Sequence, residues 1–125
     1  MPINLTQSGK EIALKNVIGR TFSTNNYIKL YTNNLTVSNS TVIDDIEECD
    51  IAGYAPIRLL QNNWTIVDSI ASYPNVTFTL NEEVIVYGYF VTQNDVLLYV
   101  EPFNTPISLS SSGGTVFVGI NIGFL

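Results

Sequence analysis

The residues that could carry chemistry are few, because the chain contains no histidine and only one cysteine, Cys49. Without histidine, Ser-His-Asp and Cys-His catalysis and His-based zinc sites are excluded. Cys49 lies between Glu48 and Asp50, and neighbouring carboxylates raise a thiol pKa, which disfavours the reactive thiolate. We therefore expect Cys49 to be a small residue on a loop or strand edge. A single cysteine also cannot form an internal disulfide.

The densest group of acids lies in residues 44–50. It consists of Asp44, Asp45, Glu47, Glu48 and Asp50. Hard cations such as Ca²⁺ prefer several carboxylate oxygens, so a calcium site is one interpretation. The stretch lacks the alternating acids and the glycine of an EF-hand loop. We favour a solvated acidic loop, and we expect no metal site and no cofactor.

Four other carboxylates are candidates for glycoside hydrolysis, which uses two carboxylates on either side of the sugar. They are Glu82, Glu83, Asp95 and Glu101. Glu82 and Glu83 lie in a predicted turn, and adjacent residues on a strand point to opposite faces. Nothing in the sequence brings another acid to the separation that this reaction needs. We expect no catalytic residues, and we expect that the protein is not an enzyme.

Aromatic side chains could instead form a sugar-stacking platform or a protein interface. The candidates are Tyr27, Tyr31, Tyr54, Trp64, Tyr73, Tyr87, Tyr89 and Tyr99. For Trp64, and for Phe78, Phe90 and Phe117, we favour packing in the core or on a sheet face. For the tyrosines, both interpretations stay open.

The charge distribution excludes some partners. Charged residues make up only 13% of the chain, well below the usual quarter or so, and the net charge is −6. All five cations lie in the first 58 residues. Because phosphate neutralisation needs lysine or arginine, we expect neither nucleic-acid nor anionic-membrane binding. A surface of neutral polar residues tolerates burial in an interface, which favours a component of an assembly.

The elements that would position these residues are nearly all strands. The exception is a helix predicted at about residues 9–18, where Ser8 and Glu11 form a capping box and Gly19 suits the C-terminal cap. Strands are predicted from apolar alternation between turn residues, with a turn at Tyr73-Pro74-Asn75 and a hairpin turn at Gln93-Asn94-Asp95. Their ranges are 27–32, 56–60, 64–70, 76–80, 84–92, 96–100, 107–109 and 115–124. The sequence of residues 84–92 suits a strand buried on both faces.

This pattern predicts an all-β fold: an antiparallel β-sandwich, jelly-roll-like, with one short N-terminal helix. We expect residues 1–125 to form a single domain, without a signal peptide or a membrane-spanning segment. Residues 116–125 are apolar to the end. They are either a central core strand or a strand whose edge or end meets a partner, since long apolar edges otherwise favour aggregation.

Three segments resemble a family of small virion structural proteins of tailed bacteriophages. They are LTQSGKEIALKNVIG followed by YIKLYTNN, then AGYAPIRL, and then YGYFVTQNDVLLYVEPFNTPISLSSSGG. They occur in the order of the family's helix, first strands and later hairpin. The long polar and acidic insertion at residues 32–50 departs from the pattern.

The resemblance implies a structural function and carries no catalytic residues. We expect a capsid decoration or cement protein that stabilises the shell through protein–protein contacts, or alternatively a tail- or fibre-associated module that binds a receptor or glycan. The implied partners are capsid or other virion proteins and further copies of the chain. The implied location is the virion, which assembles in the host cytoplasm.

Overall fold

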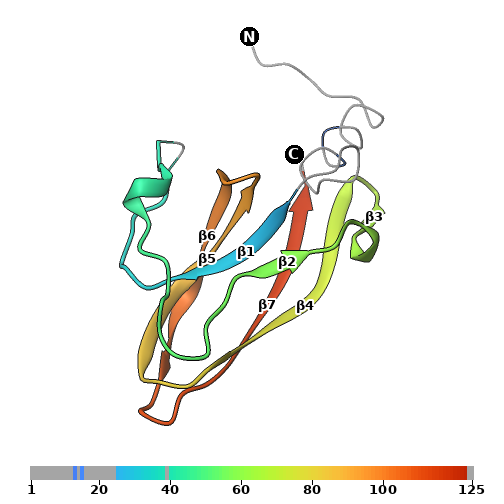
Figure 1. Cartoon of the computed structure of the whole chain (residues 1–125). Coiled ribbons are helices and arrows are strands. Elements are labelled where there is room, and N and C mark those ends of the chain that lie inside the picture. The colour runs from blue at the N-terminus through green and yellow to red at the C-terminus, as the bar shows by residue number, and fades with distance from the viewer. Residues whose placement is uncertain (1–12, 14, 16–24, 39, 124–125) are drawn as a thin grey trace.

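The computed structural model describes residues 13, 15, 25–38 and 40–123 (Figure 1). The described fold is all-β, with two antiparallel sheets and two short 3-10 turns. The seven strands are β1 (Asn26–Tyr31), β2 (Ile57–Leu59), β3 (Thr65–Val67), β4 (Ile70–Leu80), β5 (Val84–Gln93), β6 (Val96–Leu109) and β7 (Gly114–Gly123). The 3-10 turns are η1 (Ile43–Asp45) and η2 (Gln61–Asn63).

The strands form a four-stranded sheet with the order β2-β1-β5-β6 and a three-stranded sheet with the order β3-β4-β7. Buried residues of both sheets contribute to one hydrophobic core, so the two sheets form a β-sandwich. In the four-stranded sheet these include Ile28, Leu30, Leu59, Val86 and Val91, and in the three-stranded sheet Ala71, Val76, Phe78, Leu80, Val116, Val118 and Ile120. The predicted sandwich is therefore confirmed. The predicted helix at residues 9–18 lies outside the described residues, except for Ala13 and Lys15.

Strand β5 is buried on both faces over residues 88–92, as predicted, whereas Ile85 in its first half is 46% exposed. It pairs with β1 on one side and β6 on the other, and every residue from 88 to 92 is buried. Val91 packs in the core between the sheets, while Phe90 packs beside Tyr31 on the other face, with ring centroids 6.5 Å apart. The close approach of Tyr31 requires a glycine at position 88, since a Cβ there would lie 2.5 Å from the Tyr31 hydroxyl.

Two hairpins close with two-residue turns in which both central residues have positive φ. These are Asp68 and Ser69 between β3 and β4, and Asn94 and Asp95 between β5 and β6. Such turns match the twist of the flanking strands. The hairpin predicted at residues 93–95 is therefore confirmed.

The turn predicted at Tyr73, Pro74 and Asn75 is wrong. These residues lie inside β4, where the pairing with β7 shifts register between Tyr73 and Val76. A bulge of this kind accommodates a proline inside a strand because it interrupts the regular hydrogen-bond ladder. The ranges predicted at 96–100 and 107–109 likewise join into the single long strand β6.

The polar and acidic insertion packs along β1 instead of forming a strand of its own. Asn33 joins its two ends: its Nδ2 donates to the Asp45 carbonyl at 2.9 Å, and its Oδ1 accepts from the Glu47 amide at 3.0 Å. Cys49 then donates its amide to the Leu30 carbonyl at 2.9 Å. Among the described residues, no helix is long and apolar enough to cross a membrane.

Candidate interaction surface

The two sheets present four edges, and they differ in length. β2 and β3, at one edge of each sheet, are three residues long. β6 and β7, at the other edges, have 14 and 10 residues. A long edge strand exposes a row of unpaired backbone groups that can pair with another chain. β6 and β7 are therefore the edges that could bind a further strand.

The edge of β6 carries features that oppose such pairing. Pro102 and Pro106 lack an amide hydrogen and cannot donate to a ladder. Val86 of β5 pairs with Ile107 of β6, whereas Gly88 pairs with Pro102. The extra residues on β6 between these two pairs form a bulge, and a bulge bends its strand. Glu101 adds a negative charge. Prolines, irregular pairing and charges are the devices by which natural sheets protect their edges.

The edge of β7 carries neither a proline nor a charge, and where its pairing with β4 shifts register the extra residue belongs to β4. Its sequence, GTVFVGINIG, contains no proline and no charged residue. Within the part of the chain that the structure describes, β7 pairs only with β4. At about 3.4 Å per residue, its ten residues span about 34 Å. This is the longest uninterrupted and uncharged edge among the described strands.

The side chains of β7 alternate between the core and the outer face of the three-stranded sheet. Val116, Val118 and Ile120 are buried, whereas Phe117 is 64% exposed. Phe117 therefore does not pack in the core: it lies on a sheet face, and that face is exposed. Phe117 lies two residues from both Thr115 and Gly119, and Asn121 follows two residues after Gly119. Because side chains alternate along a strand, all four residues point outward.

The outer face of the three-stranded sheet is polar but almost uncharged. Phe117 lies opposite Thr77 of β4, and Thr115 lies opposite Thr79. Val67 and Ile70, at the other end of this sheet, are 61% and 48% exposed. An exposed phenylalanine among threonines is a surface that can be desolvated at low cost.

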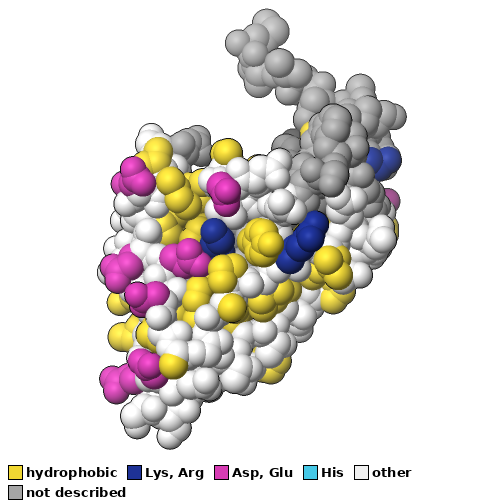
Figure 2. Space-filling view, in the orientation of Figure 1, with side chains coloured by type: hydrophobic (Ala, Val, Ile, Leu, Met, Phe, Trp, Pro, Cys, Tyr) yellow, Lys and Arg dark blue, Asp and Glu magenta, His cyan; other side chains and the backbone are white. Residues whose placement is uncertain are grey.

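Acidic residues lie elsewhere. Residues 25–123 contain ten carboxylates and only two cations, Lys29 and Arg58. Figure 2 shows that most of the visible acidic side chains gather on the side of the molecule formed by the η1 loop and the β4–β5 turn. Lys29 lies with its Nζ 5.9 Å from the centre of the Phe90 ring.

A cleft of about 360 Å³ lies where β6 and the end of β7 face each other, lined in part by Tyr89, Tyr99, Glu101 and Asn121. The Tyr89 hydroxyl donates to Glu101 Oε2 at 3.0 Å, and the Tyr89 and Tyr99 rings meet edge to face at 6.5 Å. Among the described residues, the buried Tyr99 hydroxyl has no hydrogen-bond partner. Burial, followed by the charge of Glu101, raises the pKa of Tyr89, so both phenols stay protonated at neutral pH.

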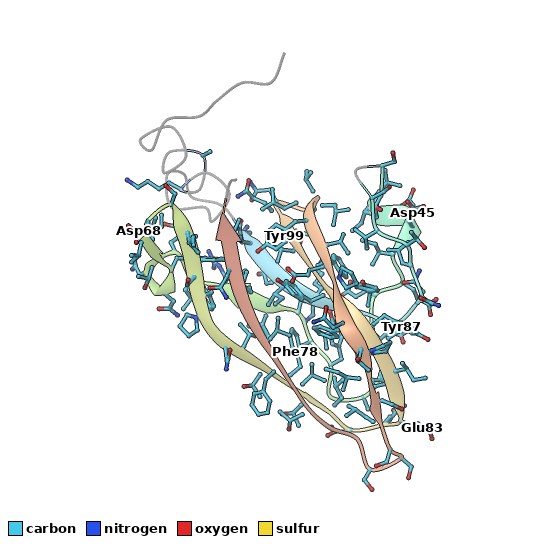
Figure 3. All side chains as sticks on the ribbon, turned by 180° about the vertical axis from the view of Figure 1, so that it is seen from behind. Asp45, Asp68, Phe78, Glu83, Tyr87 and Tyr99 are labelled. Carbon is cyan, nitrogen blue, oxygen red and sulfur yellow. The ribbon has the colours of Figure 1, made fainter. Side chains whose placement is uncertain are left out.

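The structure does not bring the four candidate catalytic carboxylates together. Glu82 and Glu83 precede β5, whereas Asp95 follows it in the turn to β6. Glu82 Oε1 accepts the Ala52 amide at 3.3 Å. Figure 3 shows Glu83 and Tyr99 at opposite ends of the sandwich. Glu101 lies on β6 opposite Tyr89 of β5. It is therefore not in the turns that carry Glu82, Glu83 and Asp95.

The backbone of the acidic stretch is hydrogen-bonded to β1 and to Asn33, while most of its acidic side chains point to solvent. Asp44, Asp45, Glu47 and Asp50 are exposed, in agreement with the predicted acidic loop. Cys49 is 2% exposed and belongs to the core, where burial, followed by Asp50 and Glu48, raises its thiol pKa. Among the described residues, no three His, Cys, Asp or Glu side chains are arranged to hold a metal ion.

The candidate aromatic platform does not form. Trp64 is 3% exposed, as predicted, and meets Tyr73 edge to face at 5.0 Å. Tyr31 and Tyr89 are buried, and the other five tyrosines are half-buried. The exposed aromatic residue that the pattern should have identified is Phe117, whose parity with Thr115 and Asn121 was visible in the sequence.

No family model, no curated protein and no solved structure matches this chain.

Proposed function

We propose that the chain is a structural protein of a bacteriophage virion: a capsid decoration or cement protein that stabilises the shell through protein–protein contacts. The observation that carries the proposal is the 64% exposure of Phe117 on an almost uncharged sheet face. Large apolar side chains that are exposed beside polar neighbours are typical of interaction sites. The partners are capsid or other virion proteins, in line with the three segments that resemble such proteins.

Docking would bury the outer face of the three-stranded sheet against a capsid subunit. The exposed side chains on this face are threonine hydroxyls, the Asn121 amide and the apolar side chains of Phe117, Val67 and Ile70. Their burial releases water from apolar surface and requires no desolvation of a charge. One small interface of this kind is weak, but a decoration protein is present in many copies, and the contacts add up over the shell.

The proposal also includes four features that follow from the sequence. These are a single domain over residues 1–125, a jelly-roll-like strand arrangement, a homo-oligomer and a location in the virion. The alternative, a tail- or fibre-associated module that binds a receptor or glycan, depended on an exposed platform of tyrosines. That motivation weakens because no tyrosine is more than half exposed.

The experiment is cosedimentation of the purified protein with capsids of the phage that encodes it, prepared without this protein. Mass spectrometry of gradient-purified particles from the same phage gives an independent reading. We expect Phe117→Ser to reduce binding by about tenfold, because a large apolar contact is worth about 1.5–3 kcal/mol.

The matched control is Val96→Ser, which removes a similarly exposed apolar side chain, 65% against 64% for Phe117, from the start of β6 in the other sheet. A loss confined to Phe117→Ser supports the proposed surface. Absence of the protein from purified particles would overturn the proposed function.

A further inference from the structure

The unpaired edge of β7 fits one kind of partner particularly well. It has ten residues, no charge and no proline, and within the described residues it pairs on one side only. The three other edges are short or interrupted: β2 has three residues, β3 covers only three residues of β4 and leaves a β4 edge that contains Pro74 and a bulge, and β6 contains Pro102 and Pro106. A further strand can therefore add over a long distance only at β7.

We propose that the β7 strands of two copies of this chain pair antiparallel across a two-fold axis, which joins their three-stranded sheets into one six-stranded sheet. A two-fold contact needs a surface that is complementary to itself. An antiparallel pair of identical strands satisfies this condition, because each residue i that faces residue j is matched by j facing i. The inference concerns the chain alone and deepens the proposed function by naming its homo-oligomer.

Electrostatics favours a second copy over a charged partner. Residues 25–123 carry ten carboxylates and two cations, so two copies repel each other over most of their surface. The β7 edge brings no charge to the contact, and a partner with basic residues would find no counter-charge on this strand. The outward side chains Thr115, Phe117 and Asn121 form good cross-strand neighbours of their own kind, since threonine and aromatic pairs stabilise antiparallel strands.

The pairing also has a consequence for docking. Because Phe117 points to the outer face of the sheet and not along its edge, it would remain on the surface of the joined sheet. Two copies of Phe117 would then lie close together near the two-fold axis. The proposed capsid-binding surface is doubled without any change in the fold of each chain.

The test is the mass of the purified full-length protein, measured by light scattering over a concentration series. We expect a mass that rises to twice the 13.8 kDa of the chain. Phe117→Glu should raise the dimer dissociation constant at least about tenfold, because it places two like charges near the axis and removes two aromatic neighbours.

The matched control is Thr77→Glu, which adds the same charge to the same face on the strand paired with β7. It should change the dissociation constant by less than about threefold. Val67→Glu places the charge at the opposite edge, on β3, and should also have little effect.

Hydrogen exchange gives a second reading that does not depend on substitutions. Amides of β7 should become more protected as the protein concentration rises, while those of β3 and β6 should not. A monomer at every concentration overturns the inference, and so does a dimer that Val67→Glu weakens more than Phe117→Glu. A monomer that still binds capsids would overturn this inference alone, whereas a dimer missing from particles would overturn only the proposed function.

Discussion

The hydroxyl of Tyr54 connects the acidic insertion to the sandwich, and its removal should destabilise the fold. It donates to Glu48 Oε2 at 2.6 Å and accepts the Leu30 amide at 3.3 Å. The ring stacks on Phe78 with centroids 6.0 Å apart. Tyr54→Phe keeps this stacking but removes both hydrogen bonds, so the substitution measures the hydroxyl alone.

The expected loss of stability in Tyr54→Phe depends on whether water can replace each lost hydrogen bond. A hydrogen bond to a charged group contributes about 1.5–3 kcal/mol, and an unpaired buried donor costs about 1–3 kcal/mol. Leu30 is fully buried, so its amide finds no replacement, whereas Glu48 is half-buried and can turn toward water. We therefore expect Tyr54→Phe to lower the free energy of unfolding by about 2–3 kcal/mol.

Urea denaturation followed by the fluorescence of Trp64, the only tryptophan, measures this loss. With a slope of about 1.5 kcal/mol per molar urea, the midpoint should fall by about 1.5 M. Tyr87→Phe is the control, because the Tyr87 hydroxyl makes no hydrogen bond among the described residues, and it should change stability by less than about 0.5 kcal/mol. A loss below about 0.5 kcal/mol in Tyr54→Phe would refute the reasoning.

Three further predictions follow from packing and ionisation. Gly88→Ala should cost about 1–3 kcal/mol by overpacking, because its Cβ would press on the Tyr31 ring; an unchanged urea midpoint would contradict this. Phe117→Ser should change stability by less than about 0.5 kcal/mol, whereas Phe78→Ala should cost about 3–5 kcal/mol, and equal losses would show that Phe117 is not exposed. Burial raises the pKa of the Tyr99 phenol above its ordinary value of 10.0, so the folded state keeps a proton that the unfolded chain releases. This stabilisation is complete below pH 10 and is lost above it at up to about 1.4 kcal/mol per pH unit. Urea midpoints compared at pH 8 and pH 11 test this prediction. Tyr99→Phe should show a smaller fall in the midpoint between these two pH values.

Local patterns were enough to predict most of the strands. The alternation of residues 76–80 and the apolar run at 84–92 correspond to buried positions in β4 and β5. Asn94 and Asp95 marked a hairpin because asparagine and aspartate tolerate the positive φ that this turn requires. These signals depend only on residues a few positions apart.

Predictions that depended on distant residues failed. The Tyr73-Pro74-Asn75 segment has the composition of a turn, but β7 pairs with it on both sides of a bulge. A Cβ on Gly119 would lie 2.9 Å from Asn75 Oδ1, so the bulge is adjacent to a residue 44 positions further along the chain. No local rule connects these two positions.

The candidate surface was partly visible in the sequence. Residues 116–123 lie in β7, as predicted, and β7 is an edge strand of its sheet; the choice between a central and an edge strand depended on which strands pair with it. Size and hydrophobicity suggested that Phe117 is buried, whereas parity placed it with Thr115 and Asn121. For an edge strand with one covered face, parity is the stronger signal, because a one-residue shift would expose Val116, Val118 and Ile120.

The distribution of charge makes the neutrality of β7 informative. The chain has few charged residues overall, so a neutral strand could reflect composition alone. Yet β6, the other long edge, carries Glu101, Pro102, Pro106 and a shifted register. Those features prevent edge-to-edge pairing. Two edges of the same molecule face the same hazard of aggregation, and only one is protected. An edge that is left long and neutral beside a protected one supports the proposed pairing of β7 with a second copy.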